Sequence, residues 1–148
     1  EELARDMQGA YALVVNAYEA EIICKKTGKT FDELRQSVEL LVVTHGKDGS
    51  RIYQNGSVTS VTAFPPHEIK DPTGGGDAFR SGLLRGIAAG WPMELCAQVG
   101  SLCATYALEK DGTQNHVYTI PEFIERFRTF YDDQGRLDSL LQPVSTSA

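Results

Sequence analysis

Residues 71–84 read Asp71-Pro72-Thr73-Gly74-Gly75-Gly76-Asp77-Ala78-Phe79-Arg80-Ser81-Gly82-Leu83-Leu84. An extended segment meets a helix here, because apolar residues recur at helical spacing from Ala78 to Ala89. The first amides of a helix lack intrahelical partners and lie at the positive end of its dipole. Three consecutive glycines let a backbone approach a ligand closely. The stretch therefore predicts an anion-binding turn at the start of a helix.

Asp77 is the chemical candidate in this turn. A carboxylate beside bound phosphate can accept the proton of a hydroxyl group that attacks a phosphoryl group. The spacing is not that of a Walker loop, since no Lys-Ser or Lys-Thr follows the glycines, and it is not G-x-G-x-x-G. On these residues alone a plainer interpretation is favoured, in which Asp77 caps the helix and the glycines form a tight turn.

The flanking patterns predict an α/β chain. Apolar runs at 11–15 and 40–44 are typical of buried strands, and the helices expected after Asn16 and after the capping box at Thr30 imply that these strands are parallel. Turn signals at 46–49 and 55–56 flank short strands at 51–53 and 58–62, which we expect to pair antiparallel at one edge. Helices are predicted over 78–89, 93–109 and 121–131.

Composition excludes several classes of protein. The 148 residues fit one domain, and the net charge of −6, with both signs mixed along the chain, argues against a nucleic-acid partner. Cys24, Cys96 and Cys103 include no C-x-x-C pair, which favours a reducing, cytoplasmic setting over disulfides or zinc. No apolar run approaches the ~20 residues of a membrane span. We therefore expect neither a nucleic-acid partner nor a membrane.

Residues 71–84 resemble the C-terminal signature of the PfkB, or ribokinase-like, carbohydrate kinase family, whose usual form is D-T-x-G-A-G-D. Pro72 and Gly75 depart from the commonest residues, whereas Asp77 is kept. Residues 16–19 resemble the family's N-x-x-E motif, and residues 43–49 are similar to its T-x-G-x-x-G turn. The resemblance implies a three-layer α/β/α sandwich with a mainly parallel sheet and antiparallel edge strands.

The resemblance also implies a reaction, the transfer of phosphate from ATP to a sugar or nucleoside hydroxyl. Asp77 would be the general base, with the amides of Gly74, Gly75 and Gly76 as the anion hole. The other expected nucleotide-binding positions are Asn16, Glu19, Thr44, Gly46, Gly100, Ser101 and Gly112, with Glu19 also holding Mg²⁺ through water. Taken alone, Asn16 is a helix cap, Gly100 and Ser101 suit helix packing, and Gly112 is an ordinary helix C-terminal glycine.

A monovalent cation such as K⁺ is a further implication of the resemblance. Its expected positions are Asp71, Thr73, Ala107, Lys110, Gly112 and His116. Such a cation prefers hard oxygen ligands, here backbone carbonyls for the most part.

The resemblance covers only the second half of a typical family member. Residues 1–136 would be the C-terminal part of a kinase domain and 137–148 a loose tail, while the N-terminal half, with the acceptor site and a lid that can form homodimers, would be absent. The opening residues 1–7 have helical composition without a preceding cap, which predicts a cut inside or just before a helix. We therefore expect this piece alone to bind nucleotide poorly and to phosphorylate nothing.

The acceptor stays open between sugars and nucleosides. Residues 112–116 and Pro72 resemble bacterial branches of adenosine kinases and sugar kinases. Two rival interpretations are a catalytically silent nucleotide-binding or regulatory member of the fold, and a purely structural oligomerisation fragment. The intact Asp77 argues against the silent member.

Overall fold

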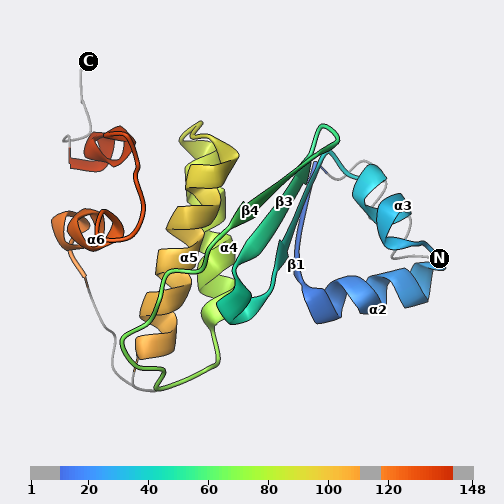
Figure 1. Ribbon diagram of the computed structural model, residues 1–148, viewed down its shortest axis with the longest axis horizontal. Helices are drawn as coiled ribbons and strands as arrows, with labels where there is room; N and C mark the ends of the chain where they lie inside the picture. Colours follow the sequence, from blue (N-terminus) through green and yellow to red (C-terminus); the bar gives the residue numbers. More distant parts are fainter. Residues whose placement is uncertain (1–10, 111–117, 142–148) are drawn as a thin grey trace, which may run out of the picture. The chain divides into compact units, whose positions relative to one another are not determined.

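The computed structural model describes residues 11–110 and 118–141. The chain divides into two compact units, a first unit of residues 1–65 and a second unit of residues 66–148 (Figure 1).

The first unit is a four-stranded sheet with two helices. Its elements are β1 (Ala12–Asn16), α2 (Ala17–Thr27), α3 (Phe31–Gln36), β2 (Leu40–Thr44), the 3-10 turn η1 (Gly46–Asp48), β3 (Ser50–Gln54) and β4 (Ser57–Val61). The strand order is β1-β2-β3-β4, in which β1 and β2 are parallel while β3 and β4 add antiparallel to β2. The predicted parallel pair and antiparallel edge strands are confirmed, although only one of the three ladders of the described sheet is parallel.

Local signals explain why these elements form. Asn16 caps α2 and Thr30 caps α3, each through a side-chain oxygen that accepts the amide three residues on. Asn55 and Gly56 both have positive φ, as a two-residue hairpin turn between β3 and β4 requires. The predicted caps and hairpin are thus confirmed.

The core of the first unit lies on the α2 and α3 side of its sheet (Figure 1). Val15 of β1 and Leu41 and Val43 of β2 pack there with Ala20 of α2 and with Leu34. Alternate residues of β2 point to the opposite face, and Leu40 and Val42 are also fully buried. Strand β2 is therefore buried on both faces, as its continuous apolar run indicates, whereas most of β4 is exposed.

The second unit is helical in its described part. It contains α4 (Gly75–Ala88), α5 (Met93–Glu109), α6 (Ile120–Phe127) and the 3-10 segment η2 (Arg136–Leu141). Helices α4 and α5 touch through glycines, because a Cβ on Gly82 would lie 2.9 Å from the Cα of Gly100. Any larger side chain at these positions would push the two helices apart.

The C-terminal part differs from the sequence prediction in two ways. Helix α6 ends at Phe127 instead of continuing to Tyr131, so that Phe130 is 44% exposed. Leu137 is fully buried within η2, so the packed part of the chain extends past the predicted boundary at residue 136. Arg128 supports this segment by donating two hydrogen bonds to Asp133, at 2.9 and 3.0 Å, and one to Asp138.

Candidate active site

The glycine turn of the second unit begins α4. Gly74 occupies the cap position with φ of 84°, in the left-handed region that favours glycine, and within the described residues no side chain caps the helix. Gly75 and Gly76 form the first turn with Asp77. Among the described residues, a Cβ on Gly76 would have the Arg80 Nη1 atom as its neighbour, at 3.9 Å, so there is room for a side chain at this position. The predicted helix is confirmed, but it begins at Gly75, three residues before Ala78, where the apolar periodicity starts.

Asp77 lies in the first turn of α4 and not at its cap. The interpretation of Asp77 as the helix cap is therefore wrong, because Gly74 holds that place. The Asp77 side chain is 89% exposed, and its Oδ1 atom lies 3.3 Å from Arg80 Nη1, one turn along the helix. An exposed carboxylate beside open helix amides can accept a proton from a hydroxyl group placed near a bound phosphate.

The segment before the glycines is tied to the end of α5. The amides of Lys70 and Asp71 both donate to the Leu108 carbonyl, at 2.8 and 3.1 Å. Asp71 Oδ1 accepts from the Thr73 hydroxyl at 2.7 Å and from its amide at 2.9 Å. These two hydrogen bonds hold the pKa of Asp71 below its usual range, and the bond from the Thr73 hydroxyl has the larger effect.

These contacts bring four of the predicted cation-site residues to one end of the second unit. Asp71 and Thr73 lie beside the last turn of α5, which holds Ala107 and leads into Lys110. The Asp71 carboxylate and Thr73 hydroxyl are the hard oxygen donors that K⁺ requires, but the Ala107 carbonyl already accepts from the Lys110 amide at 3.3 Å. Gly112 and His116 lie outside the described residues. The donor set fits a monovalent cation in part, and the site remains a prediction.

Gly100 and Ser101 serve helix packing. Both are buried, and a Cβ on Gly100 would lie 2.7 Å from the Phe79 carbonyl oxygen of α4. The packing alternative is therefore supported for Gly100, and a nucleotide contact at Gly100 or Ser101 stays a prediction.

The first unit gathers its predicted residues at the carboxyl end of its parallel strands. Asn16 ends β1 and Thr44 ends β2, and the two are partners in the parallel register. Asn16 Nδ2 donates to Glu19 Oε1 at 2.8 Å, while the Glu19 amide donates to Asn16 Oδ1 at 2.7 Å. Gly46 follows with φ of 57°. The plainer role of Asn16 as a cap is thus confirmed, and the same bonds fix the direction of the Glu19 carboxylate, where a water of a Mg²⁺ shell would bind.

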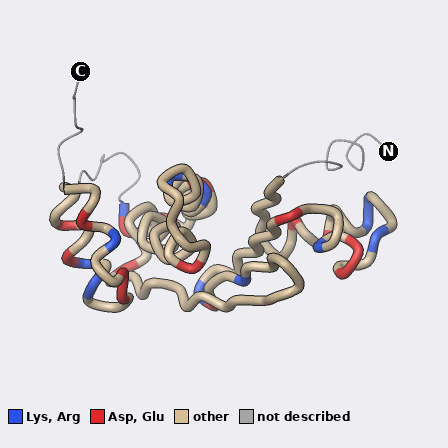
Figure 2. The backbone as a smooth tube through the Cα atoms, turned by 90° about the horizontal axis from the view of Figure 1, so that it is seen from above, with Lys and Arg blue, Asp and Glu red and all other residues tan. Residues whose placement is uncertain are grey.

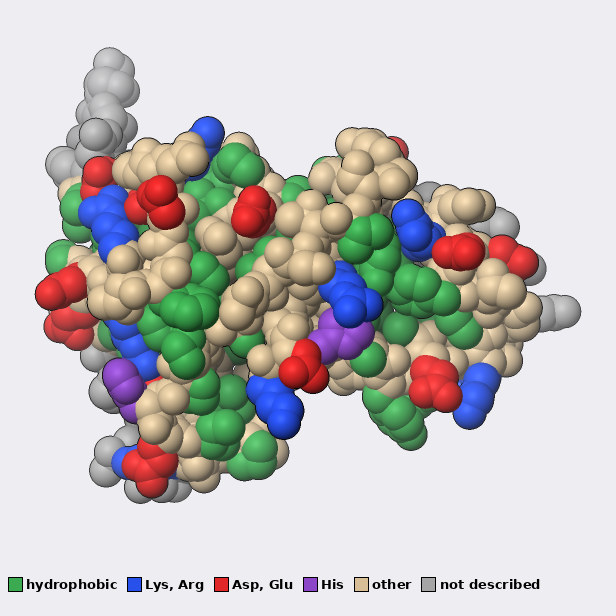
Figure 3. Space-filling view, in the orientation of Figure 1, with side chains coloured by type: hydrophobic (Ala, Val, Ile, Leu, Met, Phe, Trp, Pro, Cys, Tyr) green, Lys and Arg blue, Asp and Glu red, His purple; other side chains and the backbone are tan. Residues whose placement is uncertain are grey.

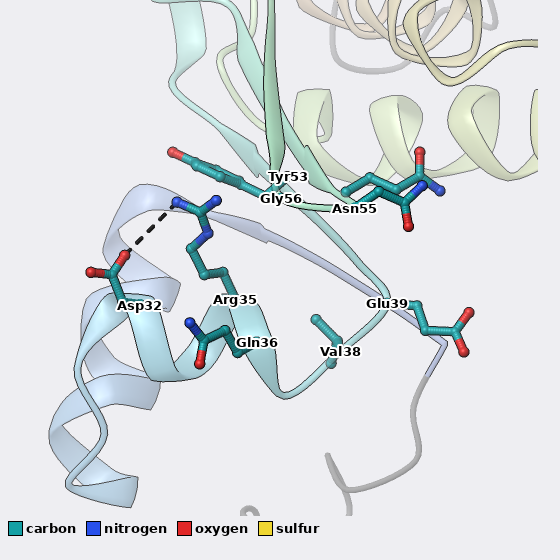
Figure 4. A pocket seen from close by; sticks show the side chains of 9 residues that line it. Asp32, Arg35, Gln36, Val38, Glu39, Tyr53, Asn55 and Gly56 are labelled. Atoms are coloured by element: carbon teal, nitrogen blue, oxygen red, sulfur yellow. Dashed lines mark ion pairs between the residues drawn. The ribbon is translucent and has the colours of Figure 1, made fainter.

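A pocket that no sequence motif indicates lies at the other end of β2 (Figure 4). Its lining includes Asp32, Arg35, Gln36, Val38, Glu39, Tyr53, Asn55 and Gly56. Arg35 lies 3.8 Å from Asp32 Oδ1 and 5.2 Å from the centre of the Tyr53 ring, while Glu39 points away from it. The positive group of this pocket is therefore already partnered, and we assign the pocket no role.

Charge on the molecule is mixed. Figure 2 shows both basic and acidic residues along the backbone of each unit, and the face in Figure 3 carries both signs interspersed. Within the described residues we find neither a helix long and apolar enough to cross a membrane nor a gathering of three His, Cys, Asp or Glu side chains that could hold a metal ion.

Comparison with known proteins identifies the family. Residues 1–120 match the profile of the pfkB family carbohydrate kinases. A nucleoside kinase of Methanothermobacter thermautotrophicus is 35% identical over 113 residues, which are 76% of this chain and 36% of that protein. The solved structure of the Burkholderia thailandensis nucleoside kinase in complex with inosine matches with a TM-score of 0.82 at 35% identity, over 86% of this chain and 43% of that one.

The fold itself is shared more widely. Ribokinase of Thermotoga maritima matches with a TM-score of 0.73 at 19% identity, over 84% of this chain and 44% of that one. The chain spans 36% and 38% of the length of two curated nucleoside kinases that it matches, which is less than half of each protein. The predicted α/β, ribokinase-like fold is confirmed, and the chain belongs to the pfkB family of carbohydrate kinases.

Proposed function

We propose that this chain carries the nucleotide-binding and catalytic part of a kinase that transfers phosphate from ATP to a nucleoside hydroxyl. The observation that carries the proposal is the start of α4, where an exposed carboxylate, Asp77, follows a glycine turn that no side chain caps among the described residues. The family match supplies the reaction class, because the turn alone would suit many anions.

In the proposed reaction the amides of Gly74, Gly75 and Gly76 bind the oxygens of the transferring phosphate, where negative charge develops. Asp77 accepts the proton of the acceptor hydroxyl as its oxygen bonds to phosphorus. The bond between phosphorus and the β-phosphate oxygen breaks, and ADP leaves. Mg²⁺ would neutralise charge on the phosphates.

The first unit would hold the nucleotide through Asn16, Glu19, Thr44 and Gly46. Support comes from the mutual hydrogen bonds of Asn16 and Glu19 at the carboxyl end of β1, because ligands of open α/β sheets bind at such strand ends. Glu19 would orient water on Mg²⁺. K⁺ at Asp71 and Thr73 and a cytoplasmic homodimer remain predictions.

A nucleoside acceptor is favoured over a sugar by the relatives. Two relatives that match 76% and 77% of this chain are named nucleoside kinases, and the Burkholderia thailandensis structure contains inosine. The retained Asp77 favours an active enzyme over a silent member of the fold.

A panel of acceptors tests the proposal. The protein expressed from its complete gene is mixed with ATP, Mg²⁺ and inosine, adenosine, cytidine, ribose or fructose 6-phosphate, and the phosphorylated product is identified by mass spectrometry. We expect nucleosides to exceed both sugars in kcat/KM by at least about tenfold, since a site built to bind a base leaves polar groups unpaired with a bare sugar. Preference for a sugar would overturn the acceptor class, and no turnover with any acceptor would favour the silent member.

A further inference from the structure

A second pocket of the second unit lies between α4 and α5. Its volume is about 280 Å³. The polar residues of its lining are Ser81 and Arg85 of α4, Cys103 and Tyr106 of α5, Lys110 after α5, and Tyr118. None of these residues belongs to the predicted nucleotide or catalytic set except Lys110, for which only the backbone carbonyl was expected to bind a cation.

The pocket concentrates unpaired positive charge. Arg85 belongs to α4 and Lys110 directly follows α5. Within the described residues neither forms an ion pair, whereas Arg80, Arg126 and Arg128 each contact a carboxylate. The described lining contains no carboxylate. In a chain with a net charge of −6, two cations converging on one pocket favour an anionic ligand.

Tyr118 adds a neutral donor. Its hydroxyl lies 4.0 Å from Cys103 Sγ. A tyrosine hydroxyl ordinarily carries its proton near neutral pH. It can therefore donate a hydrogen bond to an anion held by the two cations.

We propose that this pocket binds a small organic phosphate through Arg85 and Lys110, with Ser81 and Tyr118 as further donors. A phosphate ester carries about −1.5 to −2 charges near neutral pH, which matches two cations. The same lining also contains the small residues Ala78, Gly82 and Ala107, which provide apolar surface for the organic part of the phosphate ester. Occupancy would join α4, which carries Asp77, to the end of α5.

The Arg85 end of this site is distant from the glycine turn, whereas Ala78 follows Asp77 directly and Lys110 lies two residues after Leu108, whose carbonyl accepts the Asp71 amide. Arg85 lies ten residues beyond Gly75 on one helix, which places it about 15 Å along the axis from the first turn, beyond the Debye length of about 8 Å at physiological salt. Removing the Arg85 charge should therefore weaken an anion in the pocket without weakening one at the glycine turn.

Calorimetric titration with inorganic pyrophosphate tests the proposal on the protein expressed from its complete gene. We expect Arg85→Gln and Lys110→Gln each to weaken one class of pyrophosphate sites by about tenfold, the effect of losing one charge-assisted hydrogen bond. Arg136→Gln is the matched control, because it removes an exposed positive charge of the same unit outside the pocket. Its affinity should stay within about twofold of the wild type, as expected for a distant screened charge.

The position of the ligand is checked by alkylation. Pyrophosphate should slow the reaction of Cys103 with iodoacetamide, followed by peptide mass spectrometry, and leave Cys24 of the first unit unaffected. Wild-type affinity in Arg85→Gln, with unchanged labelling of Cys103, would overturn the proposal and assign all pyrophosphate binding to another place. Tighter binding of malonate than of pyrophosphate would overturn the phosphate class.

Discussion

The starts of α2 and α4 are two helix N-termini used in opposite ways. At α2 the Asn16 side chain accepts the Glu19 amide and returns a hydrogen bond to the Glu19 carboxylate, so the positive end of the helix is satisfied from within. At α4 the cap is Gly74, which has no side chain to offer, and two more glycines follow. The first arrangement fixes a carboxylate, whereas the second leaves amides for an outside anion.

The difference shows that the helix dipole alone does not make a site. Helices α3 and α6 are also capped by side chains, Thr30 and Thr119, and their ends are stabilised in the same way as that of α2. A side-chain cap would stabilise α4 too, and its absence from the described structure fits a position kept for phosphate.

Among changes that alter the helix starts themselves, the largest expected effect comes from placing a charge at the start of α4. Gly76→Asp places a carboxylate where a side chain has room. We expect kcat/KM for phosphoryl transfer to fall by about 10²–10³-fold, comparable to the loss of an oxyanion-hole donor. The free energy of unfolding should stay equal or rise by about 0.5–1 kcal/mol, because glycine is a poor helix former and an acid favours a helix N-terminus.

Gly76→Ala is the control for this change, since it adds a methyl group without charge. It should gain stability and keep most activity. Equal activity of Gly76→Asp and the wild type would contradict the proposal that a phosphate binds at the start of α4.

The second unit also contains a structural aspartate, Asp133, whose substitution should have a smaller effect, confined to stability, and leave activity intact. Asp133 is buried, and the hydrogen bonds from Arg128 lower its pKa to about 2, below its ordinary value of 3.8. The stability it contributes is therefore fully present above about pH 4 and is lost as the pH falls toward 2. We expect Asp133→Asn to lower the free energy of unfolding at pH 7 by about 1–2 kcal/mol, a range reduced for the partly exposed Arg128.

Urea denaturation at a series of pH values measures this contribution. The Asp133→Asn variant should lose part of the fall in stability between pH 4 and pH 2 that the wild type shows, while its kcat for phosphoryl transfer stays unchanged. A drop in kcat with unaltered stability would mean that Asp133 acts in the reaction.

The smallest effect concerns the closed start of α2. Asn16→Ala removes the cap and should lower the free energy of unfolding by about 1 kcal/mol. Thr30→Ala removes the same kind of cap from α3, which carries no predicted site residue. We expect similar losses of stability from both variants, but a fall in kcat/KM for ATP only with Asn16→Ala, because only that variant removes the hydrogen bond from Asn16 Nδ2 to the Glu19 carboxylate. Equal kcat/KM for ATP in Asn16→Ala and Thr30→Ala would mean that Asn16 acts only as a helix cap.

Local signals account for the parts of the fold that the sequence predicts correctly. Asn16 and Thr30 mark helix starts through their own side chains, and the apolar run at Leu40–Thr44 coincides with β2. The glycine turn before Asp77 is located from sequence because the turn and the family motif are contiguous, while the role of Asp77 as base stays a prediction. These features need only residues within one turn or one strand of each other.

Features that depend on packing between distant residues were not predicted. The end of α6 at Phe127 follows from the pairing of Arg128 with Asp133 and Asp138, which no periodicity indicates. The bidentate contact of Glu109 with Arg126, at 2.6 and 2.7 Å, joins residues 17 apart. The pocket with Arg85 and Lys110 likewise exists only once α4 and α5 have packed through Gly82 and Gly100.

Phosphoryl transfer by Asp77→Asn tests the central claim most directly. The substitution keeps the size of the side chain and removes its ability to accept a proton, so the protein expressed from its complete gene should bind ATP with a Kd within about threefold of the wild type, while kcat for its best acceptor falls by about 10³-fold. A kcat within about tenfold of the wild type would contradict the assignment of Asp77 as the general base.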